Sequence, residues 1–277
     1  MISVVMAVYK GDKNIRQQLL SVLSQLSFGD EVIVSDDRPG EITERIVKQI
    51  AARDSRVIWV EGKNKGDTAN LVNAIRHCKG DKIFFCDCKD VWLPDKVKRV
   101  TEAFEKGADL VVHNAYITDD YLSITDYSLF EKYSVNKNPL HNIYKNTFLL
   151  SCMAVDRKML KKIMPVPRGV PVTAQWIGII ASVYGKVSLV DIPLMYCRVD
   201  KSKRKAFEEN FRRISNTAVL SKLEIAQKEC YETEYWLELL FETDCLSEEI
   251  YKKLHNDCGA IRRMLISSLK TVKANRT

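Results

Sequence analysis

Long hydrophobic runs are missing from this chain of 277 residues. No apolar stretch approaches the roughly 18 to 20 residues of a membrane-spanning helix, and the first residues do not resemble a secretory signal. The eight cysteines are scattered, without the paired spacing of a metal-binding finger. These absences predict a protein of the reducing cytoplasm, with neither a membrane span nor a zinc finger.

A glycine-rich turn is missing as well. The first apolar run is followed by Tyr9 and Gly11, without the three spaced glycines of a dinucleotide-binding fold, so a dehydrogenase is disfavoured. No stripe of interleaved basic and aromatic residues supports nucleic-acid binding. The net charge of +7 suits an anionic lipid surface or a diphosphate, and it suits an ordinary basic surface equally well.

What the first third does contain is an alternation of short apolar runs with amphipathic stretches. In one such stretch Ile15, Leu19 and Leu23 recur at the spacing of a helix face. The alternation predicts right-handed βαβ units around a mostly parallel sheet, the α/β class. Strands are predicted at residues 2–8, 31–37, 56–60 and 81–86, and helices at about residues 15–26, 41–52 and 66–78.

The composition predicts two parts. A hydrophobic content of 46% supports the core of one α/β domain over residues 1–204, and long helical patterns predict a helical extension over residues 205–277. Near the end, residues 260–270 are basic and amphipathic. This stretch fits a peripheral helix on an anionic membrane surface, at the inner face of the membrane, and it also fits a plain surface helix or a dimer contact.

Polar residues gather where three predicted strands end. Val8 is followed by Tyr9, the second strand ends in Asp36 and Asp37, and a loop at residues 87–90 follows the fourth strand. In open α/β sheets, ligands bind outside the carboxyl ends of the strands. We therefore expect these three groups to form one ligand site.

The loop at residues 87–90 opens a longer motif, residues 87–96 (DCKDVWLPDK). The motif resembles the Asp-Gln-Asp-Asp-x-Trp-Leu-Pro-Asp-Lys pattern of bacterial family 2 inverting glycosyltransferases of the rhamnosyl and capsule-building kind. That resemblance implies the nucleotide-binding A-type glycosyltransferase fold. Other segments match the family in order over about residues 1–200: residues 3–11, 15–25, 34–37, 64–70, 80–85, 108–111, 151–154, 176–178 and 184–186.

The resemblance also implies a pocket for a nucleotide-sugar donor. Tyr9 would pack on the nucleotide base, Asp36 or Asp37 would accept hydrogen bonds from the pyrimidine and the ribose, and Asp87 would hold the ribose. Each has a plainer alternative, since aspartates before Pro39-Gly40 are common turn formers and Tyr9 can be an aromatic at the core edge. The donor-binding residues that the resemblance implies are Val8, Tyr9, Asp36, Asp37, Gly66, Asn70 and Asp87.

The motif departs from the family at Lys89, where a metal-binding Asp is expected. The Lys89 ammonium would supply part of the charge that a metal gives to a leaving diphosphate, or it is a solvated loop lysine. Asp87 and Asp90 could still bind Mg²⁺ or Mn²⁺, although the neighbouring Lys89 would weaken such a site. Asp90 would act in catalysis beside Lys89, or it caps the helix near Pro94.

A general base cannot be assigned from the sequence. The family places a base Asp in a His-Asp-x-Trp segment, and this chain has residues 173–176 (TAQW) there, so Trp176 alone is kept on the acceptor side. His113 follows a strand and would also face the acceptor, unless it is simply hydrogen-bonded there. Two further departures are Leu150, where relatives often have Gly, and Asp200, where the pattern usually ends in His.

Two functions follow from these residues. The first is a glycosyltransferase that moves a sugar, with inversion, from a UDP or dTDP sugar to a growing cell-surface glycan or a lipid-linked acceptor. The second is a catalytically degenerate protein of the same fold that binds nucleotide or a partner transferase without turnover. Tyr9, Asp37 and Asp87 are expected under both. Loss of both the metal Asp and the base Asp favours the second, whereas the general habit of the family favours the first, and the glycosyltransferase is the prediction that we adopt.

Overall fold

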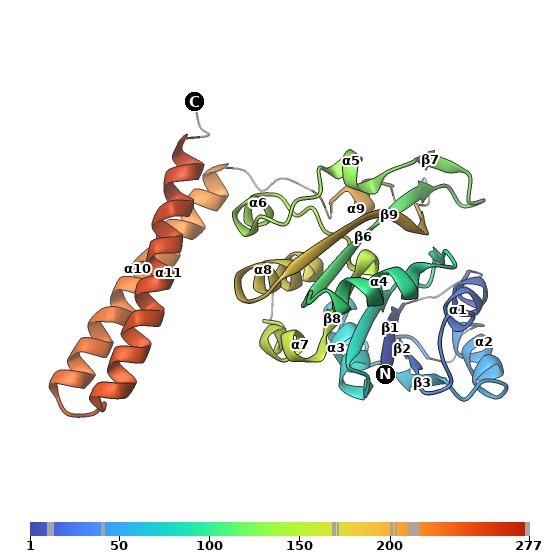
Figure 1. The fold of residues 1–277 in the computed structure, drawn as a ribbon, viewed down its shortest axis with the longest axis horizontal. Helices are drawn as coiled ribbons and strands as arrows, with labels where there is room; N and C mark the ends of the chain where they lie inside the picture. Colours follow the sequence, from blue (N-terminus) through green and yellow to red (C-terminus); the bar gives the residue numbers. More distant parts are fainter. Residues whose placement is uncertain are drawn as a thin grey trace. The chain divides into compact units, whose positions relative to one another are not determined.

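The computed structural model describes residues 1–9, 14–39, 42–167, 170, 172–199, 202, 204–209, 211 and 216–274. Gly11, Gly40 and Asp200, which the sequence singled out, lie outside these residues. The chain forms two compact units, Met1–Arg212 and Arg213–Thr277 (Figure 1).

The first unit extends beyond the division expected after residue 204. Helix α9 (Arg204–Glu209) belongs to it, because Phe207 and Phe211 pack on the ring of Tyr133, with centroid distances of 6.0 Å and 3.7 Å. These aromatic contacts join the segment after β9 to the α/β core.

One sheet runs through the first unit, in the strand order β3-β2-β1-β4-β8-β6-β9-β5, with β7 paired to β6. Pairing is parallel from β3 to β4 and between β6 and β9, and antiparallel at the other joins. The parallel half is the βαβ arrangement that the alternating pattern predicts. The strands are β1 (Ile2–Val8), β2 (Glu31–Asp36), β3 (Val57–Glu61), β4 (Lys82–Cys86), β5 (Val91–Trp92), β6 (Leu110–Thr118), β7 (Ile124–Asp126), β8 (Met153–Asp156) and β9 (Val187–Arg198).

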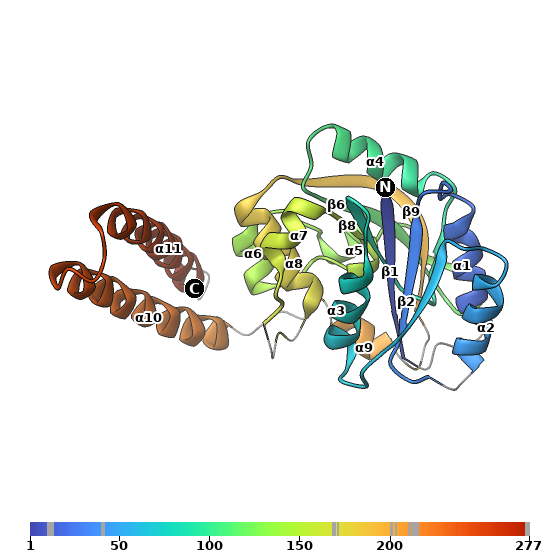
Figure 2. The ribbon, with the colours of Figure 1, turned by 90° about the horizontal axis from the view of Figure 1, so that it is seen from below.

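Helices cover both faces of the parallel half. α1 and α2 lie on one face of β1 and β2, and α3 lies on the other (Figures 1 and 2). β2 is buried along its whole length, as expected for a strand covered on both faces. The helices of this unit before α9 are α1 (Ile15–Leu23), α2 (Ile42–Ala51), α3 (Asp67–His77), α4 (Lys96–Glu105), α5 (Leu129–Tyr133), α6 (Pro139–Tyr144), α7 (Arg157–Ile163) and α8 (Thr173–Tyr184), with a 3₁₀ turn η1 at Leu150–Cys152.

The strand register brings the expected polar groups to one edge of the sheet. Val8 pairs with Asp36, and Asp36 pairs in turn with Glu61. On the other side of β1, Met6 pairs with Cys86, the last residue of β4. The ends of β1, β2 and β4 therefore lie next to one another.

The second unit is a hairpin of two long antiparallel helices, α10 (Asn216–Glu242) and α11 (Glu248–Ala274) (Figure 1). The Sγ atoms of Cys230 and Cys258 are 3.4 Å apart, and the rings of Phe241 and Tyr251 stack with centroids 4.4 Å apart. The predicted C-terminal helical extension is confirmed. Among the described residues, no helix is both long and apolar enough to cross a membrane.

Candidate active site

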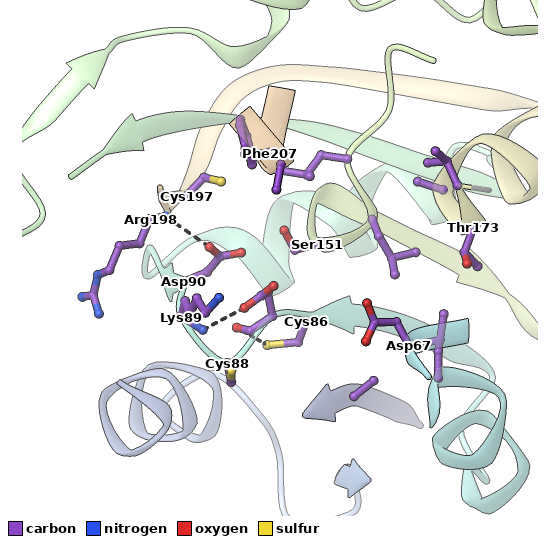
Figure 3. A pocket seen from close by; sticks show the side chains of 18 of the residues that line it. Asp67, Cys86, Cys88, Lys89, Asp90, Ser151, Thr173, Cys197, Arg198 and Phe207 are labelled. Carbon is purple, nitrogen blue, oxygen red and sulfur yellow. Dashed lines mark hydrogen bonds between the residues drawn. The ribbon is translucent and has the colours of Figure 1, made fainter. Parts of the chain in front are cut away.

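A cavity of about 560 Å³ opens at the carboxyl edge of the sheet (Figure 3). Its wall is built from the ends of β1, β4 and β9, the first turns of α3 and α8, the loop after β4, the segment around η1, and α9. The lining residues are Ala7, Tyr9, Asp67, Thr68, Leu71, Cys86, Asp87, Cys88, Lys89, Asp90, Phe148, Leu149, Leu150, Ser151, Val172, Thr173, Ala174, Cys197, Arg198, Val199, Ala206 and Phe207.

The loop after β4 is held in a defined shape by its own aspartate and by α1. The Lys89 backbone N–H donates to Asp87 Oδ1 at 2.9 Å. Gln18, buried in α1, donates its side-chain N–H to the Asp87 carbonyl at 3.0 Å and to Cys86 Sγ at 2.9 Å. These hydrogen bonds fix the backbone of the loop at the cavity rim, and both Asp87 and Lys89 line the cavity.

Asp90 lies at the bottom of this loop and is buried. Its Oδ1 accepts the Arg198 backbone N–H at 3.2 Å, whereas its Oδ2 has no hydrogen-bond partner. Burial, followed by the nearby Asp87 charge, raises the pKa of Asp90 to about 7. A carboxyl group that titrates near neutral pH in a cleft is a candidate for function.

Two further ionisable side chains are buried near Asp90. Lys96 donates its ammonium to the Ser151 carbonyl at 3.0 Å and lies 4.1 Å from the centre of the Trp92 ring. Burial lowers the pKa of Lys96 to about 8. Burial and the Lys96 charge hold the pKa of His113 well below its usual value, so His113 is a neutral imidazole at pH 7. Neither side chain lines the cavity.

The two aspartates after β2 hold the neighbouring loop. Asp37 accepts the backbone N–H groups of Asn64 at 2.7 Å and of Gly66 at 3.1 Å. Gly66 adopts a φ of 87°, a conformation that favours glycine. Asp36 is buried, and its Oδ1 accepts the Arg38 backbone N–H at 3.1 Å. Both carboxylates lie outside the cavity wall.

Asn70 is buried inside the α3 contact with the sheet. Its side-chain amide donates to the carbonyls of Val8 and Ser35, each at 3.0 Å, and its Oδ1 accepts the Ser35 hydroxyl at 2.6 Å. This side chain ties α3 to the ends of β1 and β2, and it does not line the cavity. The structure therefore gives no geometric support to Asn70 as a donor-binding residue.

Of the aromatic candidates, one reaches the cavity. Tyr9 lines it and is 53% exposed. Trp176 instead donates its indole N–H to the Ile163 carbonyl at 3.0 Å and packs away from the cavity.

The position expected for the base lies on the cavity wall, but its side chain has no titratable group. Ala174, in the first turn of α8, lines the cavity. The next residue, Gln175, donates its amide to the Asn142 carbonyl at 2.7 Å. The hydroxyl oxygens of Thr173 and Thr68 are 2.9 Å apart, so the first turns of α8 and α3 touch.

This contact brings Asp67 to the same side of the cavity. Asp67 is exposed in the first turn of α3 and lines the cavity. Figure 3 shows Asp67 and Thr173 on one side, and Lys89, Asp90 and Arg198 on the other. From the sequence, an acid in the first turn of a helix is fully explained by the helix dipole, so no local signal pointed to Asp67.

Arg198 is the other lining residue that the sequence did not single out. Its side chain is buried, and Nη2 donates to Gln17 Oε1 at 3.0 Å. Nε and Nη1 have no hydrogen-bond partner. Unpaired guanidinium donors are costly to bury, and a ligand oxygen would satisfy them.

The motif carboxylates do not suit a divalent cation. One oxygen of Asp87 and one of Asp90 already accept a backbone N–H, and the Lys89 ammonium beside them would repel a cation. No group of three His, Cys, Asp or Glu side chains that could hold a metal occurs among the described residues. We therefore derive no step that passes through Mg²⁺ or Mn²⁺.

The raised pKa of Asp90 predicts a specific dependence of stability on pH. Between pH 4 and pH 7 the folded state keeps a proton on Asp90 that the unfolded state has lost, because the pKa is about 7 instead of 3.8. The free energy of unfolding contributed by Asp90 therefore falls as the pH rises through this window. Urea unfolding at several pH values should show that Asp90→Asn flattens the profile by more than about 1 kcal/mol.

The matched control is Asp95→Asn, at an exposed acid of the same motif. This variant should leave the slope of stability against pH unchanged. Parallel pH profiles for the wild type and Asp90→Asn would contradict the raised pKa.

Two family models match this chain, and they match different parts of it. The family model described as glycosyl transferase family 2 matches residues 3–164, more than half of the 277 residues. A second model, described as 23S rRNA-intervening sequence protein, matches residues 201–267. The second match covers the region of α9 and the helical hairpin.

Curated relatives are glycosyltransferases. GlyA of Streptococcus pneumoniae is 26% identical over 150 residues, which covers 52% of this chain and 22% of that protein. MJ1057 of Methanocaldococcus jannaschii is 26% identical over 168 residues, which covers 59% of this chain and 58% of that protein. The chain thus spans less than two thirds of the length of either relative.

Among solved structures, S. aureus TarS 1–349 in complex with UDP-GlcNAc has a TM-score of 0.59 at 16% sequence identity. The match covers 83% of this chain and 66% of the TarS chain. Such a likeness shows the fold, and it confirms the predicted A-type glycosyltransferase fold. With the family model matched over most of the first unit, this chain belongs to glycosyl transferase family 2.

Proposed function

We propose that this protein transfers a sugar from a UDP or dTDP sugar to a hydroxyl group of a cell-surface glycan acceptor, with inversion. The observation that carries the proposal is the placement of the basic side chains. Lys89 and Arg198 line one side of the cavity, together with the carboxyl groups of Asp87 and Asp90, and Asp67 lines the other. An inverting displacement needs positive charge at the leaving diphosphate and a base on the opposite side of the reacting carbon.

The leaving-group side contains two basic side chains. Lys89 stands where the family motif has a metal-binding Asp, and Arg198 has two unpaired donors in a buried guanidinium. Together they can bind the diphosphate and stabilise the charge that develops as the bond between the sugar and the phosphate breaks. In this assignment, the basic side chains do what a metal ion would do.

On the acceptor side we assign the general base to Asp67. The Asp67 carboxylate takes the proton of the acceptor hydroxyl while the acceptor oxygen forms its bond to the anomeric carbon. The electron pair of the breaking bond leaves with the diphosphate. Thr68 and Thr173 support this role, because their 2.9 Å contact holds the first turn of α3, which contains Asp67, against the first turn of α8, which contains Ala174 at the position of the family base.

The nucleotide would lie against Tyr9, whose exposed ring can stack on a base at the end of β1. Asp87, on the cavity rim, would hold the ribose. The choice of a uridine or thymidine nucleotide follows the UDP-GlcNAc named for the TarS complex and the pyrimidine preference that the family resemblance implies. Asp37 supports this pocket indirectly, since it fixes the loop that leads into α3.

The proposal is tested by calorimetric titration with UDP and dTDP, followed by a transfer assay over a panel of sugar nucleotides and acceptors. Binding with turnover is expected, and excess EDTA should change the UDP affinity by less than about twofold because Lys89 and Arg198 carry the charge. Binding without turnover on any donor would favour a degenerate, nucleotide-binding member of the family. Failure to bind any nucleotide would rule out the donor pocket itself.

A further inference from the structure

The helical hairpin has one apolar side that its own packing does not cover. Nine large apolar side chains among the described residues of α10 and α11 are at least 40% exposed, and Ile225, Tyr231 and Tyr235 are three of them. We call the other six, which are between 40% and 58% exposed, the apolar face: Trp236, Leu240, Ile250, Leu254, Ile261 and Met264.

Helix geometry places all six residues on the same side of the hairpin. Leu240 precedes Phe241, Ile250 precedes Tyr251 and Ile261 precedes Arg262, and each of these following residues contacts the other helix. Trp236, Leu254 and Met264 are four, four and three residues away from Leu240, Ile250 and Ile261, so they share the same helix faces. Each residue step turns a helix by about 100°. We call the line of residues along which the two helices pack the seam. In an antiparallel pair, the residues one step before the seam point to the same outer side of the hairpin on both helices.

The residues one step after the seam have the opposite character. On this other side of the hairpin the exposed residues are mostly charged, with Tyr231 and Tyr235 among them; the charged ones include Glu224, Glu238, Glu242, Lys252, Arg263 and Lys270. The hairpin is therefore amphipathic as a unit. A helix pair that is apolar on its seam and again on one outer side is expected to be covered on that side.

We propose that the apolar face binds the same face of a second copy of this chain, giving a four-helix bundle. The area supports this occupant. Six exposed side chains of this size present on the order of 500 Å² per copy, or about 1,000 Å² for the pair. With the polar residues around them, the contact reaches the range of specific protein interfaces.

The charges of the two helices also support a second copy. α10 carries six glutamates and two lysines, whereas α11 carries six basic and three acidic residues. Within the hairpin, the acidic α10 and the basic α11 already form ion pairs: Arg262 binds Glu234 at 3.0 Å, and Lys273 lies 3.4 Å from Glu224. When two copies pair about a two-fold axis parallel to the helices, α10 of one copy lies beside α11 of the other, and the attraction repeats.

A membrane surface is a poorer occupant of this face. The charged residues among the apolar ones include the acids Glu229 and Asp257, each one step before the seam cysteines Cys230 and Cys258. The basic residues Arg263 and Lys270 project from the opposite side. Anionic lipid would repel these two acids. Lys222, one step before the buried Leu223, is on the same side, whereas Arg263 and Lys270 are out of reach.

The experiment is sedimentation equilibrium of the full chain from about 1 to 100 μM, a range typical of transient and stable dimers. The wild type should associate to at least twice the chain mass of 31.8 kDa. Trp236→Glu with Leu254→Glu should raise the dissociation constant at least tenfold, because charges are then buried at the centre of the contact. The matched control, Glu238→Gln with Lys252→Gln on the charged side, should associate as the wild type does.

Helix content by circular dichroism and UDP affinity establish that the charged variant is folded. A wild type that stays monomeric up to 100 μM would overturn the proposal, and so would an assembly that Trp236→Glu with Leu254→Glu leaves intact. A third arm floats the protein with vesicles of phosphatidylglycerol and phosphatidylcholine. If the wild type floats with the vesicles and Trp236→Glu with Leu254→Glu does not, the apolar face binds membrane. That result would overturn the proposal of a second copy.

Discussion

Asp67→Asn is expected to lower kcat for sugar transfer by a factor of about 10² to 10⁴, the usual contribution of a general base. The amide keeps the size of the side chain, but it cannot take the proton of the acceptor hydroxyl. Since Asp67 lies across the cavity from Lys89 and Arg198, UDP affinity should change by less than about threefold. Initial rates at saturating donor, with calorimetry of UDP on the same preparations, measure both quantities.

Two companion variants make this test specific. Glu44→Gln removes an acid from the first turn of α2, away from the cavity, and should leave kcat unchanged. Ala174→Asp in the Asp67→Asn background puts a carboxylate back on the wall at the family base position, and part of the lost rate should return. Full activity of Asp67→Asn would remove Asp67 from the mechanism.

Lys89→Ala is expected to weaken UDP binding by about 10- to 100-fold, the worth of one charge-assisted contact to phosphate. Uridine, which has no phosphate, should bind within about twofold of the wild type, because Tyr9 and Asp87 are unchanged. Calorimetric titration of both ligands against both proteins gives the two ratios directly.

The control for this variant is Lys98→Ala, at an exposed lysine of α4 outside the cavity wall. It should bind UDP and uridine as the wild type does. If Lys89→Ala weakens uridine as much as UDP, the lysine shapes the pocket instead of binding the diphosphate. If neither ligand is affected, Lys89 is a solvated loop residue.

The parallel half of the sheet could be predicted because its signal is local. The strands at β1, β2 and β4 are short apolar runs, and helices with one apolar stripe separate them. Such runs can be buried only inside a sheet covered on both faces. The remainder was harder to predict. β6 and β9 pair in parallel through a register shift at Asn114, and residues 118–147, which look irregular in sequence, contain β7, α5 and α6.

For the candidate site, the order of the motifs predicted which segments lie near the cavity more reliably than it predicted which side chains line it. Tyr9, Asp87, Lys89 and Asp90 line the cavity. Asp37 and Asn70 come from segments that match the family equally well, yet their polar atoms are occupied by backbone groups and Ser35. Sequence order specifies which segments meet at the strand ends, whereas hydrogen-bond partners depend on atomic positions.

The family, the parallel core and the absence of an acid at the family base position could all be predicted from the amino-acid sequence alone. The tertiary structure was needed to bring Asp67 and Ala174 to one cavity wall, through the contact between Thr68 and Thr173, which are 105 residues apart in the sequence. It alone showed that Arg198 is buried with unpaired donors and that six apolar residues of two helices share one outer side. These properties arise from distant segments packing together, so no local pattern of residues carries them.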